Sequence, residues 1–211
     1  MKTLDLTLYL VTDSSDMSEE EFLWKVEEAC KGGVTLLQLR EKNKSTRDYI
    51  DLAFKVKAIT DRYDLPLLID DRLDVALAVD ADGVHVGAED MPVAMARKLL
   101  GPNKIVGATA KTVAVAQQAE KDGANYLGVG AIYPTTTKVK TIITKVETLQ
   151  DICKHVDIPV GAIGGLNVEN CDILKGTDID GICVVSAIMK QNDCHKAAAQ
   201  LKEKIQSILK K

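Results

Sequence analysis

Aromatic residues are scarce in this chain of 211 residues: five Tyr, two Phe and one Trp make up 4%, although 46% of the residues are hydrophobic. A core without aromatic bulk has to be built from Val, Ile, Leu and Ala, which suits strands buried on both faces and covered by helices. The length is short for two full domains, so we expect a single domain over residues 1–211.

A strong excess of either charge is also missing. The 27 basic and 31 acidic residues leave a net charge of −4, which gives no general attraction for nucleic acid or anionic lipid. No apolar run approaches the roughly 18 residues of a membrane span, and Asp5 interrupts what would be the apolar region of a signal peptide. We therefore expect a cytoplasmic location, with any anionic ligand held by a local group of residues.

Paired cysteine motifs are absent too. The five cysteines form no C-x-x-C pair, and their odd number fits reduced structural thiols better than disulfides or zinc ligands. This composition favours a reducing compartment.

Eight short apolar or β-branched runs recur along the chain, at 6–12, 35–39, 66–69, 83–86, 104–108, 126–129, 159–163 and 181–185. Helices are expected between them, starting at the capping box of Ser18 and Glu21 and after residues 46, 92, 112 and 167, with the last over 192–209. Alternating strands and helices imply a parallel sheet. Eight units at intervals of about 25 residues favour a closed (β/α)8 TIM barrel, an α/β fold, over an open doubly wound sheet.

The chemistry of such a barrel lies at the carboxyl ends of its strands, so the residues directly after each run are candidates. Gln38, Arg40 and Lys42 point to one face of the chain after the second run. A guanidinium and an ammonium can bind a phosphate or diphosphate, although a solvated charge cluster would have the same sequence.

Carboxylates follow the third and fourth runs. Asp71 comes directly after Asp70, and Asp90 lies just beyond the fourth run. Neighbouring strand ends would bring Asp71 and Asp90 close enough to share Mg²⁺, which one or two carboxylates commonly hold together with substrate phosphates. Helix capping explains each aspartate equally well when it is taken alone. His85, inside the fourth run, is expected to be a hydrogen-bonded residue of the barrel interior.

Small and hydroxyl-bearing residues follow the remaining runs. Thr109 follows the fifth run, and Thr135, Thr136, Thr137 and Lys138 follow the sixth, where the latter residues are either donors to an anionic ligand or ordinary solvated loop residues. Gly164-Gly165 after the seventh run and Val185-Ser186 after the eighth match the usual phosphate site of such barrels, where backbone N–H groups bind the phosphate. Two separate anion sites predict two phosphorylated reactants.

In this order the segments resemble the thiamine-phosphate synthase family, also called thiamine-phosphate pyrophosphorylase, over nearly the whole chain. The matching segments are LYLVTD, GVTLLQLREK, LLIDDRLDVALAVDADGVHVGAEDMP, VGATA, YLGVGAIYPTTTK, VGAIGGL and VVSAI. The resemblance implies a transferase that joins 4-amino-2-methyl-5-hydroxymethylpyrimidine diphosphate to 4-methyl-5-(2-phosphoethyl)thiazole, giving thiamine phosphate and pyrophosphate by an Mg²⁺-assisted dissociative displacement. It implies two small-molecule substrates, no nucleic-acid or membrane partner, and a homo-oligomer as the family's habit.

The resemblance also implies a role for each matching residue. Gln38, Arg40 and Lys42 would hold the pyrimidine diphosphate, Asp71 and Asp90 would bind Mg²⁺, and Thr109 and Lys138 would contact pyrophosphate. Thr135 and Thr137, with backbone groups of Gly165, Val185 and Ser186, would contact the thiazole phosphate. Arg40, Lys42 and Lys138 would act in catalysis by neutralising the charge that develops on the departing pyrophosphate.

Some residues depart from the family pattern. Asp70 stands at a substrate-binding position where the family commonly has Asn, and its charge would either strengthen metal binding or weaken pyrimidine binding. Ala88 replaces a Gln, and Val139-Lys140 replaces an acidic residue. Two other functions therefore stay open: a thiazole tautomerase-like isomerase, although Lys111 stands near the position of that branch's histidine, and a non-catalytic homologue that binds phosphorylated ligands.

Overall fold

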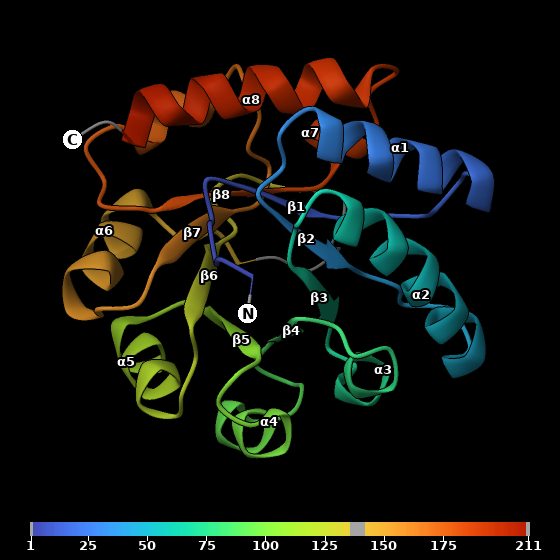
Figure 1. Cartoon of the computed structure of the whole chain (residues 1–211). Helices are drawn as coiled ribbons and strands as arrows, with labels where there is room; N and C mark the ends of the chain where they lie inside the picture. Colours follow the sequence, from blue (N-terminus) through green and yellow to red (C-terminus); the bar gives the residue numbers. More distant parts are fainter. Residues whose placement is uncertain (1, 136–141, 210–211) are drawn as a thin grey trace.

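Eight parallel strands form a closed barrel in the computed structural model of the chain, which describes residues 2–135 and 142–209 (Figure 1). The strands are β1 (Leu8–Val11), β2 (Leu36–Leu39), β3 (Leu67–Asp70), β4 (Gly83–Val86), β5 (Ile105–Ala110), β6 (Tyr126–Gly130), β7 (Val160–Ile163) and β8 (Gly181–Val184). Neighbours in sequence pair in parallel, and β1 pairs with β8 to close the barrel. The predicted (β/α)8 TIM barrel is confirmed.

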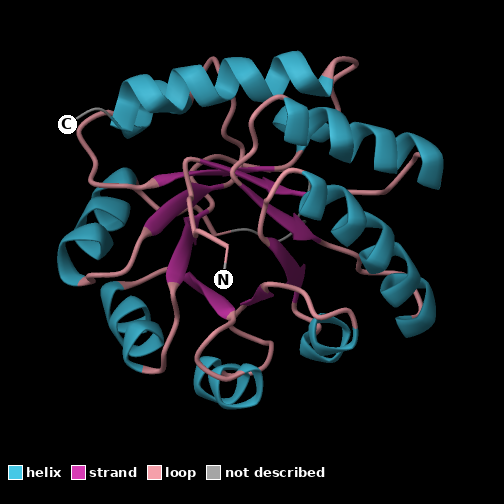
Figure 2. Ribbon diagram, in the orientation of Figure 1, coloured by secondary structure: helices cyan, strands magenta, loops and turns pink. Residues whose placement is uncertain are grey.

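Helices surround the barrel (Figure 2). They are α1 (Glu19–Lys31), α2 (Thr46–Arg62), α3 (Leu73–Ala78), α4 (Val93–Leu100), α5 (Val113–Lys121), α6 (Val146–His155), α7 (Ser186–Met189) and α8 (Cys194–Leu209), with the 3-10 helix η1 (Cys171–Leu174). Ser18, Ser45 and Thr112 cap α1, α2 and α5 with their side chains, at the starts that the sequence predicts. Among the described residues, no helix is both long and apolar enough to cross a membrane.

The helix predicted after Asn167 is wrong in kind, because only the four-residue η1 forms between β7 and β8. The Oδ1 atom of Asn167 accepts hydrogen bonds from the backbone N–H groups of Glu169 and Asn170, at 2.8 and 3.1 Å, and this side-chain turn competes with a regular helix start. Three helices that the sequence did not indicate separately, α3, α6 and α7, complete the outer layer.

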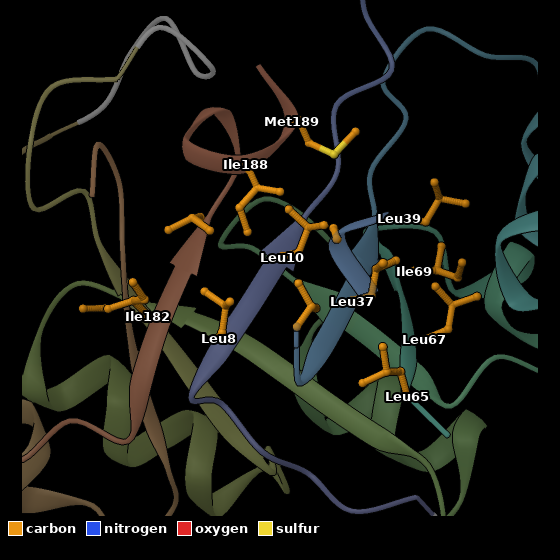
Figure 3. Packing of buried hydrophobic residues seen from close by; sticks show 14 of the residues in the cluster. Leu8, Leu10, Leu37, Leu39, Leu65, Leu67, Ile69, Ile182, Ile188 and Met189 are labelled. Atoms are coloured by element: carbon orange, nitrogen blue, oxygen red, sulfur yellow. The ribbon is translucent and has the colours of Figure 1, made fainter. Parts of the chain in front are cut away.

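Alternation along the strands divides the core into two layers. Leu8, Leu10 and Leu37 lie in the layer between the strands and the helices (Figure 3). Tyr9 and Tyr126 lie instead in a separate cluster inside the barrel, where their rings meet edge to face with centroids 5.7 Å apart. Two of the few aromatic side chains thus fill the barrel interior, and aliphatic residues fill the outer layer.

The segment before β1 covers the amino end of the barrel. Leu6 belongs to the interior cluster, and Leu4 packs against it. The Lys2 ammonium donates to the Leu65 carbonyl at 2.8 Å and pairs with Asp61 at 2.7 Å. Ligands are therefore expected at the opposite, carboxyl end of the strands.

Buried thiols account for most of the cysteines. Cys30, Cys171, Cys183 and Cys194 are buried. Burial raises the pKa of the Cys30 thiol to about 12 and raises that of Cys183 strongly as well. These thiols remain protonated, as structural cysteines do.

Candidate active site

Three carboxylates gather where β3 and β4 end. Asp70 is the last residue of β3 and is buried. Asp71 follows with a φ of 59° and donates its backbone N–H to the His85 carbonyl at 2.9 Å, a left-handed turn that aspartate adopts more readily than most residues. The Oδ2 atom of Asp90 accepts the Gly87 N–H at 2.8 Å. The strand itself therefore places Asp70, and the turns after β3 and β4 fix Asp71 and Asp90.

Asp71 lies close enough to Asp90 to affect the protonation of Asp90. Burial raises the pKa of Asp90, and the adjacent Asp71 carboxylate raises it further, while the hydrogen bond from Gly87 lowers it by less. Two carboxylates in mutual contact attract a cation, since a cation relieves their repulsion. This confirms the predicted proximity of Asp71 and Asp90.

Cationic side chains from the end of β2 face these carboxylates. Lys42 Nζ lies 2.8 Å from Asp70 Oδ2 and also contacts Asp71, and Arg40 Nε lies 3.8 Å from Asp70 Oδ2. Burial lowers the pKa of Lys42, but its hydrogen bonds to Asp70 and Asp71 outweigh burial and raise that pKa. The site thus brings together two permanent positive charges and three carboxylates, which suits a diphosphate bound with a divalent cation.

Gln38 and Thr109 lie inside the barrel near this cluster. Gln38 is buried and donates from Nε2 to the Tyr9 hydroxyl at 2.6 Å. Thr109 is partly exposed, and its Oγ1 lies 3.0 Å from His85 Nε2. His85 also contacts the Tyr126 hydroxyl through Nδ1 at 2.8 Å, so the prediction of a hydrogen-bonded interior histidine is confirmed.

Tyr9 and Tyr126 complete this interior network, and sequence reasoning missed them. A usable signal was present, because the period of two along each strand points Tyr9 and Tyr126 into the same interior as Gln38 and His85. A tyrosine inside an apolar run resembles any other core residue, because the run alone does not show whether its hydroxyl group has a hydrogen-bond partner.

The loops after β7 and β8 form the other part of the rim. Gly164 and Gly165 have φ values of 103° and 65°, and Asn170 fixes the loop by donating from Nδ2 to the Gly165 carbonyl at 2.8 Å. Val185 and Ser186 follow β8, at the start of α7. Since β7 and β8 pair, these two loops are neighbours, as a shared phosphate site requires.

The loop after β6 is described only in part. Thr135 is described and partly buried, whereas the predicted site residues Thr137 and Lys138 lie outside the described residues. Within the described ranges, no group of three or more His, Cys, Asp or Glu side chains is arranged to hold a metal ion alone.

Known proteins are similar to this chain over nearly its whole length. The sequence profile of the thiamine monophosphate synthase family matches residues 8–188. Thiamine-phosphate synthase 2 of Streptococcus pneumoniae serotype 4 is 56% identical over 204 residues, which cover 97% of both chains. Thiamine-phosphate synthase of Enterococcus faecalis is 52% identical over 205 residues, covering 97% of this chain and 93% of that one.

The chain belongs to the thiamine monophosphate synthase family. The resemblance drawn from its motifs is confirmed, and a solved structure of thiamine phosphate pyrophosphorylase from Pyrococcus furiosus has the same fold, with a TM-score of 0.88 and 41% identity over 97% of both chains. As a member of the thiamine monophosphate synthase family the chain is an enzyme, and the transferase activity predicted from its sequence agrees with the names of these relatives.

Proposed function

We propose that the chain joins 4-amino-2-methyl-5-hydroxymethylpyrimidine diphosphate to 4-methyl-5-(2-phosphoethyl)thiazole and releases pyrophosphate. The carrying observation is the cluster of Arg40 and Lys42 with Asp70, Asp71 and Asp90 at the ends of β2, β3 and β4. The bond between the methylene carbon and the diphosphate oxygen breaks, and pyrophosphate keeps the electron pair. The thiazole nitrogen then supplies the pair for the new carbon–nitrogen bond, so no protein nucleophile is needed.

The cationic side chains bind the diphosphate and stabilise its departure. Arg40 offers a guanidinium fork and Lys42 a point charge, and both stay charged as the leaving group gains charge. In our proposal Lys138 adds a third positive charge, and Thr109 donates a hydrogen bond to the pyrophosphate. Gln38 and Asp70 contact the pyrimidine part.

The donor set fits Mg²⁺ when the substrate is included. Asp71 and Asp90 supply two oxygen ligands, and Mg²⁺ commonly completes such a site with water and substrate phosphates. When bound, Mg²⁺ would neutralise charge on the diphosphate. Lys42 now pairs with Asp70 and Asp71, and it is free to turn to the diphosphate once another cation faces these carboxylates.

The thiazole phosphate takes the second anion site in this proposal. Backbone groups of Gly165, Val185 and Ser186 bind its phosphate, together with Thr135 and Thr137. Holding the nucleophilic nitrogen against the methylene carbon contributes to the rate through orientation alone. A cytoplasmic location and two small-molecule substrates belong to the same proposal.

A two-substrate assay tests the function. Purified protein with both substrates and Mg²⁺ should release pyrophosphate, and omitting either substrate or adding a chelator should abolish release. Arg40→Ala should lower kcat by on the order of 100-fold, as expected for the loss of one group that stabilises developing charge. The exposed Arg47→Ala on α2 is the matched control and should keep its rate.

The alternatives give different results in the same experiment. An isomerase would convert the thiazole substrate alone, without pyrimidine diphosphate. A binding protein would bind the thiazole phosphate in calorimetry but release no pyrophosphate from the full mixture. A normal rate in Arg40→Ala would contradict the role of the β2 cations.

A further inference from the structure

A continuous chain of hydrogen bonds crosses the barrel interior from Gln38 to Thr109. Gln38 Nε2 lies 2.6 Å from the Tyr9 hydroxyl, which lies 2.7 Å from the Tyr126 hydroxyl. The Tyr126 hydroxyl lies 2.8 Å from His85 Nδ1, and His85 Nε2 lies 3.0 Å from Thr109 Oγ1. These five side chains come from five different strands, and only the two ends belong to the proposed substrate site.

The direction of one hydrogen bond in this series fixes the direction of all the other hydrogen bonds. Each tyrosine has one hydroxyl proton to donate, and burial raises the pKa of Tyr9 and of Tyr126 well above the ordinary value, so both keep that proton. The amide nitrogen of Gln38 can only donate. Tyr9 therefore accepts from Gln38 and donates to Tyr126, and Tyr126 donates in turn to Nδ1 of His85.

The direction of these hydrogen bonds also determines which protons His85 and Thr109 donate. A neutral imidazole that accepts at Nδ1 carries its proton on Nε2. His85 then donates to Thr109 Oγ1, which leaves the threonine proton for a ligand. At the near end, Gln38 has its amide oxygen left to accept a hydrogen bond.

The opposite direction would make a different site. With the Gln38 oxygen turned to Tyr9, every bond reverses, and Thr109 spends its proton on His85. Thr109 would then present only oxygen lone pairs, which an anion repels, and Gln38 would present N–H groups. Only the first direction suits an anionic group beside Thr109.

We infer that Tyr9, Tyr126 and His85 are positioning residues that set Thr109 as a donor and Gln38 as an acceptor. The site then selects a ligand that places an N–H donor at Gln38 and an anion at Thr109. This rests on the proposed function in one respect, which is that both ends contact the same substrate. The amino group and the diphosphate of the proposed pyrimidine substrate meet this requirement.

The tautomer of His85 tests the inference without any activity. ¹⁵N-resolved NMR of the imidazole groups distinguishes the Nε2–H and Nδ1–H forms, and the chain has only three histidines, so His85→Gln assigns the signal. We expect the neutral Nε2–H form in the wild type. Gln38→Glu replaces the donor by a carboxylate that only accepts, so we expect this variant to hold the Nδ1–H form.

Removing the Tyr9 hydroxyl group distinguishes an effect passed along the hydrogen bonds from a direct effect of the new charge at position 38. In a Tyr9→Phe background the carboxylate introduced by Gln38→Glu is still present, but the series of hydrogen bonds is interrupted. Gln38→Glu should therefore no longer change the His85 tautomer. An Nδ1–H form or an imidazolium in the wild type would overturn the inference, as would an unchanged tautomer in Gln38→Glu alone. A tautomer change that persists in the Tyr9→Phe background would also overturn it.

Kinetics provide a second readout. Tyr126→Phe should raise KM for the pyrimidine diphosphate about tenfold, the cost of roughly one hydrogen bond to a charged group, and should leave KM for the thiazole phosphate unchanged. Thr109→Val, which has no hydroxyl proton to donate, should raise KM for the pyrimidine diphosphate as much as Tyr126→Phe does. Equal effects on both KM values would contradict a positioning role. An inactive wild type would refute the proposed function but leave the NMR result intact.

Discussion

Glu41 is a charged residue whose surroundings oppose its charge. Its Oε2 accepts from the Ser14 hydroxyl at 2.9 Å, but its Oε1 is buried without a partner among the described residues. Burial raises the pKa of Glu41 above its ordinary value of 4.5, and the hydrogen bond from Ser14 offsets only part of this. The folded state therefore binds the Glu41 proton more tightly than the unfolded chain does.

The raised pKa of Glu41 determines whether its contribution to stability grows or falls with pH. The contribution from a raised carboxyl pKa is fully present below the unfolded value and is lost as the pH rises through the folded value. Glu41→Gln should thus raise the free energy of unfolding at pH 7 by about 0.5 kcal/mol, a small figure because water screens this half-buried charge.

Urea titrations at several pH values test this expectation. The advantage of Glu41→Gln should shrink as the pH falls toward 4, because the wild-type carboxyl is then protonated as well. The exposed Glu203→Gln on α8 serves as the control and should show no such trend. If the difference in the free energy of unfolding between Glu41→Gln and the wild type widened at low pH, the predicted direction of the pH dependence would be wrong.

At the scale of single residues, the sequence predicts charges better than it predicts partners. Arg40, Asp71 and Asp90 were identifiable because a polar residue directly after an apolar run has few structural reasons to be there. The contact of Lys42 with both Asp70 and Asp71 could not be predicted, since it depends on how two strand ends meet in space. The roles of these residues in catalysis remain predictions.

At the scale of elements, the loop after β7 depends on the backbone freedom of glycine. Gly165 has a φ of 65°, and a Cβ there would come within 2.6 Å of Tyr133 Cβ and 2.8 Å of the Pro134 carbonyl oxygen. Gly165→Ala should therefore displace this loop and raise KM for the thiazole phosphate about tenfold or more. KM for the pyrimidine diphosphate should change little, because that substrate binds at the other strand ends.

Gly176 provides the matched control for this change. It has a similar positive φ of 80°, but an added Cβ would meet no atom within 4 Å. Gly176→Ala should cost about 1 kcal/mol of stability, the ordinary penalty for a left-handed alanine, and leave both KM values unchanged. If both variants raised KM for the thiazole phosphate alike, strain alone would explain the effect and the phosphate site would lie elsewhere.

Element positions were largely predictable, and the helix that was wrongly predicted after Asn167 has a local cause. The starts of α1, α2 and α5 follow from Ser18, Ser45 and Thr112, whose caps need only local sequence. After Asn167 the same kind of residue makes a turn instead, because its side chain binds backbone N–H groups two and three residues on. A capping residue indicates a change of direction, and only the following residues decide whether a helix grows.

For the whole molecule, the interior of the closed barrel has to fit two tyrosine rings and one imidazole. His85 and Tyr126 lie with ring centroids 5.5 Å apart, beside the glycines of β5 and β6. The eight parallel strands were predictable from the repeat length, but this filling was not, since each side chain comes from a different strand. Closure therefore links the stability of the barrel to the network that positions Thr109.

Gly107 tests this link between packing and function. A Cβ at Gly107 would overlap the Tyr126 ring, whereas a Cβ at Gly128 would stand 3.3 Å from His85 Cε1 and need only a slight shift. Gly107→Ala should lower the free energy of unfolding by about 3 kcal/mol, as overpacking of a tight core does, and Gly128→Ala by clearly less. Urea unfolding gives the stabilities, and KM for the pyrimidine diphosphate should rise in Gly107→Ala because Tyr126 is displaced from His85. Equal, small losses in both variants would show that the barrel interior can expand, and the Tyr126 hydroxyl would then not be held in place by packing.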